Sequence, residues 1–325
     1  MTIWTEALAM LDAAQTVLIV THPKPDGDAI GSLLGLGNQI RKLGKQVTCA
    51  VDEGVPPYLK FIPGSETVVS TLVAGDWDLL IMTDIADSTR GGKVGEYGLQ
   101  HCKRVLNIDH HPTNPLFGDL AMVFPTAVSA AEVVYNWWDA TAQSYEKEVA
   151  VPLLVGMVTD TQGFRTSNTN PRTLEIAMHL MERGASLTEI TARALESKTA
   201  LEFELWKMML PSAALEGKVA YATVTLEQAA KVGMNDTTDA GLVQFLVNIE
   251  EAMIAVIFKE RPQGQVTLSM RAKHGYNVAE VATQFGGGGH IQAAGATLDG
   301  TLDNIKAKVM PLLAEAVRKG KLDIV

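Results

Sequence analysis

The stretch VLIVTHPKPDGDAIGSLLGL, residues 17–36, joins two apolar runs through a short polar turn. The first run, 16–20, has the length and the β-branched residues of a strand that is buried on both faces. The second run, 29–44, has the spacing of a helix, and Gly44 is a typical residue for the position where a helix ends. A strand, a turn and a helix in this order predict the first unit of an α/β fold.

The turn between this strand and helix holds His22, Asp26 and Asp28, and Lys24 is its one cation. Each acid has a local explanation, because Asp26-Gly27 is a common turn pair and Asp28 could be the N-cap of the helix. A lone histidine at a strand end is also more often structural than a ligand. The three side chains lie close together without matching positive charge, which favours a second explanation, the binding of a cation.

The rest of the first half repeats the alternation of strands and helices. Further strands are predicted at 46–51, 78–84 and 103–111, and helices at 1–15, 126–140, 145–161 and 170–185. Continuous apolar strands separated by helical stretches are typical of a parallel sheet that is covered on both faces. We therefore expect an α/β domain with a parallel sheet.

The pattern changes after this half. Residues 186–212 are charged, helical in pattern and free of glycine, which favours a connector. A smaller α/β unit follows, with strands at 217–224, 252–261 and 265–272 and helices at 239–249, 278–285 and 301–320. We predict a first domain at 1–190, a helical linker at 191–212 and a second domain at 213–325.

Composition limits the classes of ligand. The chain has 325 residues, a net charge of −10 and 47% hydrophobic residues. A protein that holds long DNA or RNA normally has a basic face, so an extended nucleic acid is a poor candidate ligand. The sequence has no apolar run of about 18 residues. It has two cysteines and no pattern of a secretory signal, so we expect a cytoplasmic protein that binds no membrane.

Acidic and histidine residues recur at the predicted carboxyl ends of later segments. They are Asp84, Asp109, His110, His111 and, in an apolar helix, Asp160. An open parallel sheet places its ligand crevice outside the carboxyl ends of its strands, so these side chains should meet those of the first turn. Taken singly, Asp84 could be a strand terminus and 109–111 a solvated turn, but a bare carboxylate such as Asp160 in an apolar helix is costly.

Such a cluster of carboxylates repels itself, and divalent cations remove the repulsion. Carboxylates mixed with imidazoles suit Mn²⁺, Mg²⁺, Fe²⁺ or Zn²⁺, and the absence of cysteine from the cluster argues against a structural zinc site. Six ligands are more than one catalytic ion needs. Two ions that share a carboxylate fit this number, with a separation of about 3.5–4 Å in sites of this kind.

The motifs together resemble those of the DHH phosphoesterases. They are HPKPDGDAIGS at 22–32, the strand-end Asp84, DHH at 109–111 and TDT at 159–161. LSMRA at 268–272 and GGGGHIQAAG at 286–295 resemble the DHHA1 domain that follows in one branch of this family. Two residues depart from the family pattern. Gln162 stands where Gly is common in the family, and Ile291 follows His290. Neither residue touches a proposed ligand.

The resemblance implies a catalytic domain at 1–190, a substrate-binding domain at 213–325 and an active site in the cleft between them. It also implies two divalent ions, with Mn²⁺ preferred or Mg²⁺ in its place. The implied metal ligands are His22, Asp26, Asp28, Asp84, His110 and Asp160. Asp84 would bridge the ions and act in catalysis, His111 would face the substrate phosphate as a stabiliser or acid, and Asp109 would orient a histidine. The implied substrate-binding residues are Arg90 and Arg165 in the first domain and Arg271, Gly287, Gly288, Gly289 and His290 in the second. Taken alone, the glycine run could be a flexible loop.

Within the family, the chain is similar to the nanoRNase group. The resemblance implies a hydrolase that degrades short oligoribonucleotides to mononucleotides and 3'-phosphoadenosine 5'-phosphate (pAp) to AMP. A phosphodiesterase for linear dinucleotides such as pApA or pGpG, and a single-strand DNA exonuclease of the RecJ type, are the alternatives. Pyrophosphate hydrolysis and a nucleotide-binding protein without catalysis are less well supported by the motifs. The family also suggests a homodimer.

Overall fold

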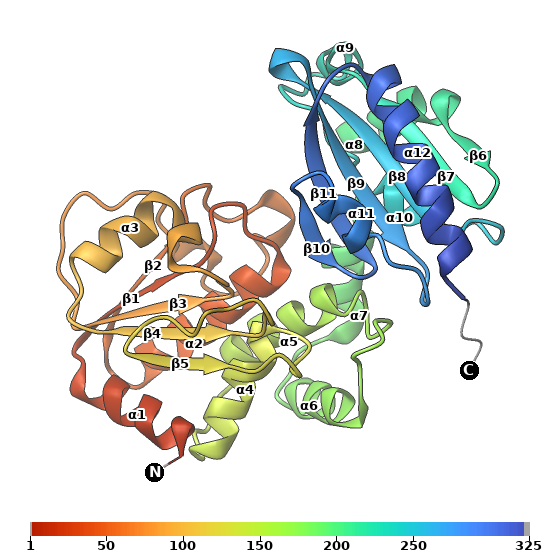
Figure 1. Ribbon diagram of the computed structural model, residues 1–325. Coiled ribbons are helices and arrows are strands. Elements are labelled where there is room, and N and C mark those ends of the chain that lie inside the picture. Colours follow the sequence, from red (N-terminus) through yellow and green to blue (C-terminus); the bar gives the residue numbers. More distant parts are fainter. Residues whose placement is uncertain (1, 322–325) are drawn as a thin grey trace. The chain divides into compact units, whose positions relative to one another are not determined.

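The computed structural model describes residues 2–321, which form two compact units that divide between Ser197 and Lys198 (Figure 1). Each unit has its own sheet and its own hydrophobic core. The division lies inside the stretch 191–212, for which the sequence indicates a connector. Among residues 2–321, no helix combines the length and the apolar character that a membrane span requires.

The first unit is built on a parallel five-stranded sheet in the order β2-β1-β3-β4-β5. Its strands are β1 (Thr16–Val20), β2 (Gln46–Ala50), β3 (Leu79–Thr83), β4 (Val105–Asp109) and β5 (Leu120–Val123). The chain runs from β1 out to β2 and then returns to β3 on the other side of β1. The neighbouring carboxyl ends of β1 and β3 are therefore a topological switch point, where α/β proteins bind ligands.

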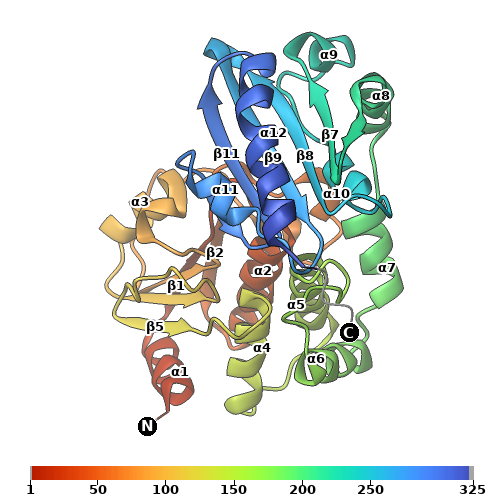
Figure 2. The same cartoon turned by 45° about the vertical axis from the view of Figure 1, so that its right-hand side comes forward.

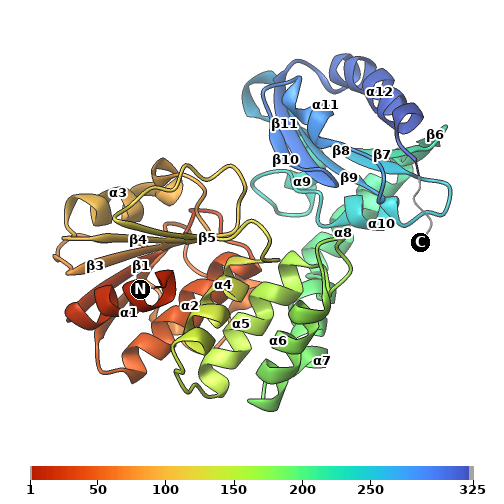
Figure 3. The ribbon, with the colours of Figure 1, turned by 60° about the horizontal axis from the view of Figure 1, so that its bottom comes forward.

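Helices cover both faces of this sheet, which confirms the predicted fold class. The helices are α1 (Ile3–Ala13), α2 (Gly27–Lys42), α3 (Gly92–Gln100), α4 (Ala130–Ala140), α5 (Lys147–Asp160), α6 (Pro171–Glu182) and α7 (Leu187–Thr191). Figures 1 and 3 show α3 on one face and α1, α2, α4 and α5 on the other. Successive residues of β1 enter different cores, Ile19 on the α2 side and Val20 on the α3 side, which explains its continuous apolar sequence.

Helices α2 and α5 pack unusually closely because glycines line their contact. Gly27, Gly31 and Gly35 recur every fourth residue, so they share one side of α2. A Cβ on Gly31 would lie 2.5 Å from the backbone oxygen of Pro152 and 2.8 Å from the backbone nitrogen of Gly156. Any side chain here would push the helices apart, and the start of α2 would then move away from the end of α5.

The second unit contains a mixed sheet in the order β10-β11-β9-β8-β7-β6. Its strands are β6 (Ala214–Glu216), β7 (Val219–Val224), β8 (Ile254–Arg261), β9 (Gln265–Ala272), β10 (Gly288–His290) and β11 (Ala293–Asp299). Its helices are α8 (Ala200–Met209), α9 (Leu226–Lys231), α10 (Leu242–Val247), α11 (Ala279–Thr283) and α12 (Leu302–Lys319). Helices α11 and α12 pack on one face, and α8 and α10 on the other (Figures 2 and 3).

Some elements differ from the sequence-based expectations. Helix α4 starts at Ala130 rather than at 126, because the Ser129 side chain accepts a hydrogen bond from the Glu132 backbone N–H and caps the helix. Helix α3 was not predicted, since its glycines weaken a helical pattern. The strands predicted at 252–261 and 265–272 are present as β8 and β9, which pair as a hairpin that turns at Pro262–Gly264.

Candidate metal centre

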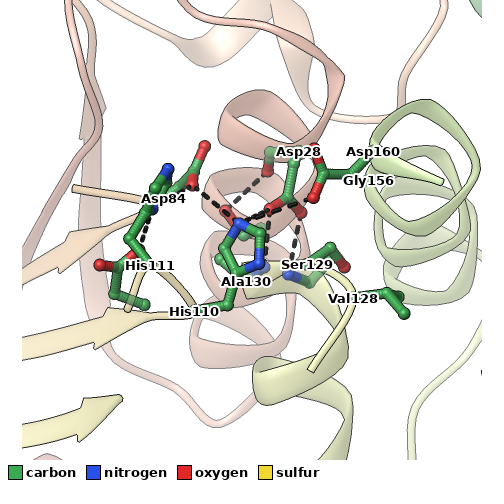
Figure 4. Close-up of polar contacts among 12 residues, drawn as sticks. Asp28, Asp84, His110, His111, Val128, Ser129, Ala130, Gly156 and Asp160 are labelled. Atoms are coloured by element: carbon green, nitrogen blue, oxygen red, sulfur yellow. Dashed lines mark hydrogen bonds and ion pairs between the residues drawn. The ribbon is translucent and has the colours of Figure 1, made fainter. Parts of the chain in front are cut away.

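Four segments of the first unit bring acidic and histidine side chains to the carboxyl edge of its sheet (Figure 4). The turn after β1 carries His22, Asp26 and Asp28. The residue after β3 is Asp84, and β4 ends in the Asp-His-His run at 109–111. Strands β1, β3 and β4 are direct neighbours in the sheet, and Asp160 joins them from the last residue of α5. The predicted convergence of these segments is therefore present in the structure.

The turn after β1 is fixed by Asp26, which is the N-cap of α2. Its Oδ1 atom accepts hydrogen bonds from the backbone N–H groups of Asp28 and Ala29, both at 3.0 Å. The sequence suggested Asp28 as the N-cap of this helix, but the structure gives this role to Asp26. Because capping uses Oδ1, the other oxygen of Asp26 can serve as a ligand.

Asp28 is instead bound to the start of another helix. Its Oδ2 atom accepts a hydrogen bond from the backbone N–H of Ala130 at 2.6 Å, and its Oδ1 atom accepts one from Ala131 at 2.9 Å (Figure 4). The N-terminus of α4 carries partial positive charge and holds this carboxylate in place. Asp28 is 2% exposed, so these bonds also satisfy a carboxylate that water hardly reaches.

Asp84 occupies the centre of the cluster. Its φ angle is 54°, in the left-handed region that non-glycine residues rarely adopt, and this kind of strain is common at functional sites. Its Oδ2 atom lies 3.6 Å from His22 Nε2. Its Oδ1 atom lies 3.8 Å from His110 Nε2 and 3.7 Å from His111 Nδ1. Asp84 is therefore placed between the histidines of two segments.

Three groups of side chains have ligand atoms that all lie within 4.8 Å of one another. They are Asp84 with His110 and His111, His22 with Asp26 and Asp84, and Asp28 with His110 and Asp160. Asp84 and His110 each belong to two groups, so the groups form one continuous centre. His110 Nε2 lies 3.6 Å from Asp160 Oδ2, which links the helical acid to the residues of the strands. All six predicted metal ligands are in this centre.

The carboxylates of this centre are destabilised as anions. Burial raises the pKa of Asp28 and Asp84 well above the usual range, and the neighbouring carboxylates add to the effect. Burial and the charge of Asp26 raise the pKa of Asp160 to about 7. A bound divalent cation would oppose both burial and repulsion. Oxygen and imidazole nitrogen donors that converge in this way fit one or more such cations.

His111 is held by a buried acid. Its Nδ1 atom donates a hydrogen bond to Asp109 Oδ1 at 2.8 Å, and this bond raises the pKa of His111. Asn114 Nδ2 donates to Asp109 Oδ2 at 2.7 Å and to Asn107 Oδ1 at 2.8 Å. Asp109 is fully buried, so its partners fix the histidine ring firmly. The sequence-based search missed Asn107 and Asn114. Their one signal in the sequence is their position, two residues before the Asp-His-His run and three residues after it.

The predicted arginines of the first unit lie on exposed turns. Burial lowers the pKa of His22 and the positive charge of Arg90 adds to this effect, so Arg90 is near the centre. Arg165 Nε donates a hydrogen bond to the backbone oxygen of Gln162 at 2.7 Å. Gln162 has a φ of 51°, which explains physically why Gly is common at this position.

The predicted substrate-binding residues of the second unit share one end of its sheet. The register places His290 of β10 opposite Ala293 of β11, and Ala293 opposite Arg271 of β9, so their side chains share one face. The last two glycines of the run, Gly288 and Gly289, belong to β10. A Cβ on Gly287 would lie 2.2 Å from the backbone oxygen of Gly295, so close backbone approach requires glycine there.

Two family models match the chain in sequence order. Residues 16–157 match the DHH family, N-terminal domain, and residues 216–318 match the DHHA1 domain. The metal-centre residues up to His111 lie in the first match. Arg271 and the glycine run lie in the second.

Several curated proteins are similar to the chain over most of its length. The bifunctional oligoribonuclease and PAP phosphatase NrnA of Thermus thermophilus is 35% identical over 93% of this chain and 89% of that protein. The protein of the same name from Bacillus subtilis is 26% identical over 90% of this chain and 93% of that protein. Both comparisons span the two units.

Solved structures show the same fold. An exopolyphosphatase-related protein from Bacteroides fragilis has a TM-score of 0.85 and 23% identity, with 98% of this chain and 96% of that chain covered. RecJ from Thermus thermophilus in complex with Mn²⁺ has a TM-score of 0.55 and 14% identity, with 98% of this chain and 55% of that chain covered. These likenesses concern the fold. The two family models and the relative that is 35% identical show that the chain belongs to the DHH family of phosphoesterases, in the branch that carries a DHHA1 domain.

Proposed function

We propose that the chain is a metal-dependent hydrolase that degrades short oligoribonucleotides to mononucleotides and converts pAp to AMP. The observation that carries this proposal is the convergence of His22, Asp26, Asp28, Asp84, His110 and Asp160 on one centre. The printed names of the similar proteins from Thermus thermophilus and Bacillus subtilis supply the substrate class. The net charge of −10 agrees with a small substrate rather than a long nucleic acid.

Six residues would hold two divalent ions, with Mn²⁺ preferred over Mg²⁺. His22 and Asp26 would bind one ion, Asp28, His110 and Asp160 would bind the other, and Asp84 would be shared between them. The ions, when bound, would lower the pKa of a water molecule and polarise the phosphoryl oxygens. Asp28 would contribute to this site with little movement, since the N-terminus of α4 already holds it.

His111 would act on the reacting phosphate. Asp109 binds its Nδ1 atom, so Nε2 is the atom that would contact a phosphate oxygen or give a proton to the leaving oxygen. The contact with Asp109 fixes the orientation of the ring before the substrate binds. Arg90 and Arg165 would add positive charge around the phosphate from the rim of the centre.

Arg271 and His290 would bind a part of the nucleotide away from the reacting phosphate. Both side chains lie on one face of the second sheet, across the small residue Ala293. The close-packed glycines 287 and 289 would let the backbone approach an anion.

A product-length assay tests this function. RNA oligonucleotides of two to twenty-four residues, labelled at the 5' or the 3' end, are incubated with Mn²⁺, and pAp, pApA and pGpG are assayed in parallel. We expect rapid cleavage of the shortest RNAs to mononucleotides and release of phosphate from pAp. Equal activity on all lengths would contradict the proposal and favour an exonuclease of the RecJ type. Activity on linear dinucleotides alone would favour the dinucleotide phosphodiesterase.

The variant Asp84→Asn is measured in the same assay. The variant should lose turnover of both RNA and pAp. Asp139→Asn is its control, because Asp139 is an exposed acid that pairs with Arg172 on the surface. The control should keep wild-type activity.

A further inference from the structure

One face of the second sheet carries a row of cationic, hydroxyl and small side chains that continues beyond Arg271. This is the face that α8 and α10 cover over β7 and β8. Farther along the same face, Lys259 of β8 lies opposite Thr267 of β9, and Thr267 lies opposite Thr297 of β11. Ser269 lies on β9 between Thr267 and Arg271, opposite Gly295.

Lys259 is half-buried and held in a defined place. Its Nζ atom donates a hydrogen bond to Ser269 Oγ at 2.7 Å. Burial lowers the pKa of Lys259, and the positive charges of Arg261 and Arg271 lower it further. Cations that are held together away from water repel one another, as the carboxylates of the candidate metal centre do. An anion bound between them would relieve this repulsion.

The acidic groups around Lys259 only partly offset these charges. Asp239 and Asp236 act on Lys259 from the loop before α10 and favour its charged form. Asp236 forms a short ion pair with Arg261, so one of these acids is already matched by a cation. Asp239 acts on both Lys259 and Arg271 and accepts a hydrogen bond from the Gly241 backbone N–H. Two cations, Lys259 and Arg271, therefore share the single carboxylate of Asp239.

The residues of β11 that lie opposite Ser269 and Arg271 are small. Gly295 lies next to Ser269, and Ala293 lies next to Arg271. Thr297 is exposed, and Thr267 and Ser269 are half-buried, so their hydroxyl groups can add hydrogen bonds. Residues two apart on one strand are spaced by about 6.8 Å. Arg271, Ser269 and Thr267 are thus polar side chains at regular steps along β9, as the side chains that contact a nucleic-acid backbone are.

We propose that Lys259, positioned by Ser269, binds an additional phosphate of the oligonucleotide, one step beyond the group that Arg271 and His290 bind. This inference rests on the proposed function and extends it. pAp has one phosphate besides the reacting one, and a tetranucleotide or longer RNA has at least two. The contribution of Lys259 therefore increases with the length of the substrate, and the residue sets a preference for RNA over pAp.

The test compares Lys259→Gln with Lys308→Gln. Lys308 is exposed on α12, which packs on the opposite face of the same sheet, so the control removes the same charge elsewhere. kcat/KM is measured for pAp and for RNAs of two to five residues with Mn²⁺. We expect the loss of kcat/KM for Lys259→Gln to be about tenfold larger for a tetranucleotide than for pAp. This is the fold-change that the loss of one hydrogen bond to a charged group produces. Lys308→Gln should match the wild type on every substrate.

Two outcomes would overturn the inference. Equal losses for pAp and tetranucleotide would assign Lys259 to the same contact as Arg271, and no loss on any substrate would remove it from the site. Ser269→Ala is the second variant, expected to give a smaller loss with the same dependence on length. Thermal unfolding of each variant checks that the second unit is folded.

A binding measurement separates this inference from the proposed function. Anisotropy of a fluorescein-labelled tetranucleotide is titrated with metal-free protein, which requires no turnover. Lys259→Gln should weaken binding and reduce the slope of log Kd against log salt by about 0.7, the value for one phosphate of a single strand. An unchanged Kd and slope would contradict the role of Lys259, whereas an inactive wild-type protein would contradict the proposed function alone.

Discussion

Gly156 of α5 lies directly against Asp28 of α2, since a Cβ on Gly156 would come within 2.6 Å of Asp28 Oδ1. The packing of these two helices therefore also places Asp28, a proposed metal ligand. Gly31, on the same side of α2 as Asp28, provides the close approach of the helices. A substitution in this contact should affect stability and metal binding together.

Gly156→Ala should lower the free energy of unfolding by about 1–3 kcal/mol, the usual cost of forcing a methyl group into a packed interior. It should also weaken Mn²⁺ binding, because the new methyl group displaces Asp28. Gly95→Ala in α3 is the control, since its Cβ would meet Met82 Cε at an ordinary 3.5 Å. Urea unfolding and Mn²⁺ titration measure the two effects. A Gly156→Ala variant as stable as the wild type would contradict the close packing.

Asp109→Asn should reduce kcat by about 10–100-fold with a smaller change in KM. An asparagine has one acceptor oxygen in place of two, so it cannot accept from both His111 Nδ1 and Asn114 Nδ2, and the ring would lose its fixed orientation. Asn114→Ala, which removes a donor to the other oxygen of Asp109, should have a weaker effect of the same kind. Steady-state kinetics on pAp give both constants. A change in KM alone would show that Asp109 affects binding rather than the chemical step.

Asp78 should contribute to the pH dependence of stability at a site away from the metal centre. Its carboxylate accepts hydrogen bonds from Lys103 Nζ at 2.7 Å and from the Gln15 backbone N–H at 2.9 Å, and these contacts lower its pKa. A lowered folded-state pKa gives stability that is complete above the unfolded value of about 3.9 and is lost as the pH falls.

Asp78→Asn should therefore lower the unfolding temperature at pH 7, and its difference from the wild type should shrink as the pH falls from about 4 towards 2. Lys103→Gln should cost less, because an exposed ion pair contributes little and the backbone contacts of Asp78 remain. Thermal unfolding followed by circular dichroism at several pH values measures this. A constant difference between Asp78→Asn and wild type across this range would contradict the assigned titration.

The two cysteines, which are both free, should differ in reactivity. Burial raises the pKa of the Cys49 thiol to about 11, and the side chain is fully buried beside Arg41. Cys102 is half-buried, so it should react first with iodoacetamide at pH 8. Mass spectrometry of the labelled peptides gives the order. Labelling of Cys49 before Cys102 in folded protein would contradict the packing of β2.

Much of the fold could be predicted from local sequence. The apolar run at 16–20 and the glycine-terminated helix after it are present as β1 and α2, because both patterns depend on short-range periodicity. Strand β5 has only four residues at the edge of the sheet, and α3 begins in a glycine-rich segment, so neither gives a clear local signal. Elements of this kind depend on tertiary packing.

The candidate site shows the same limit. The convergence of Asp84 with the Asp-His-His run could be inferred, since strand ends of a parallel sheet meet at one edge. The sequence could not reveal that Asp26 caps α2 and that Asp28 binds the N-terminus of α4. The contact of Asp28 with Ala130 joins residues that are 102 positions apart in sequence. Lys259 was also missed, since its neighbours on β9 and β11 are known only from the register.

The most direct test of the central claim is a calorimetric titration of Mn²⁺ into metal-free protein, for the wild type and for Asp84→Asn, with turnover of pAp measured on the same samples. We predict that the wild type binds two ions per chain and is active. Asp84→Asn should lose at least one ion, because Asp84 belongs to two of the ligand groups, and should lose turnover. An Asp84→Asn variant that binds two ions and keeps wild-type turnover would contradict the account.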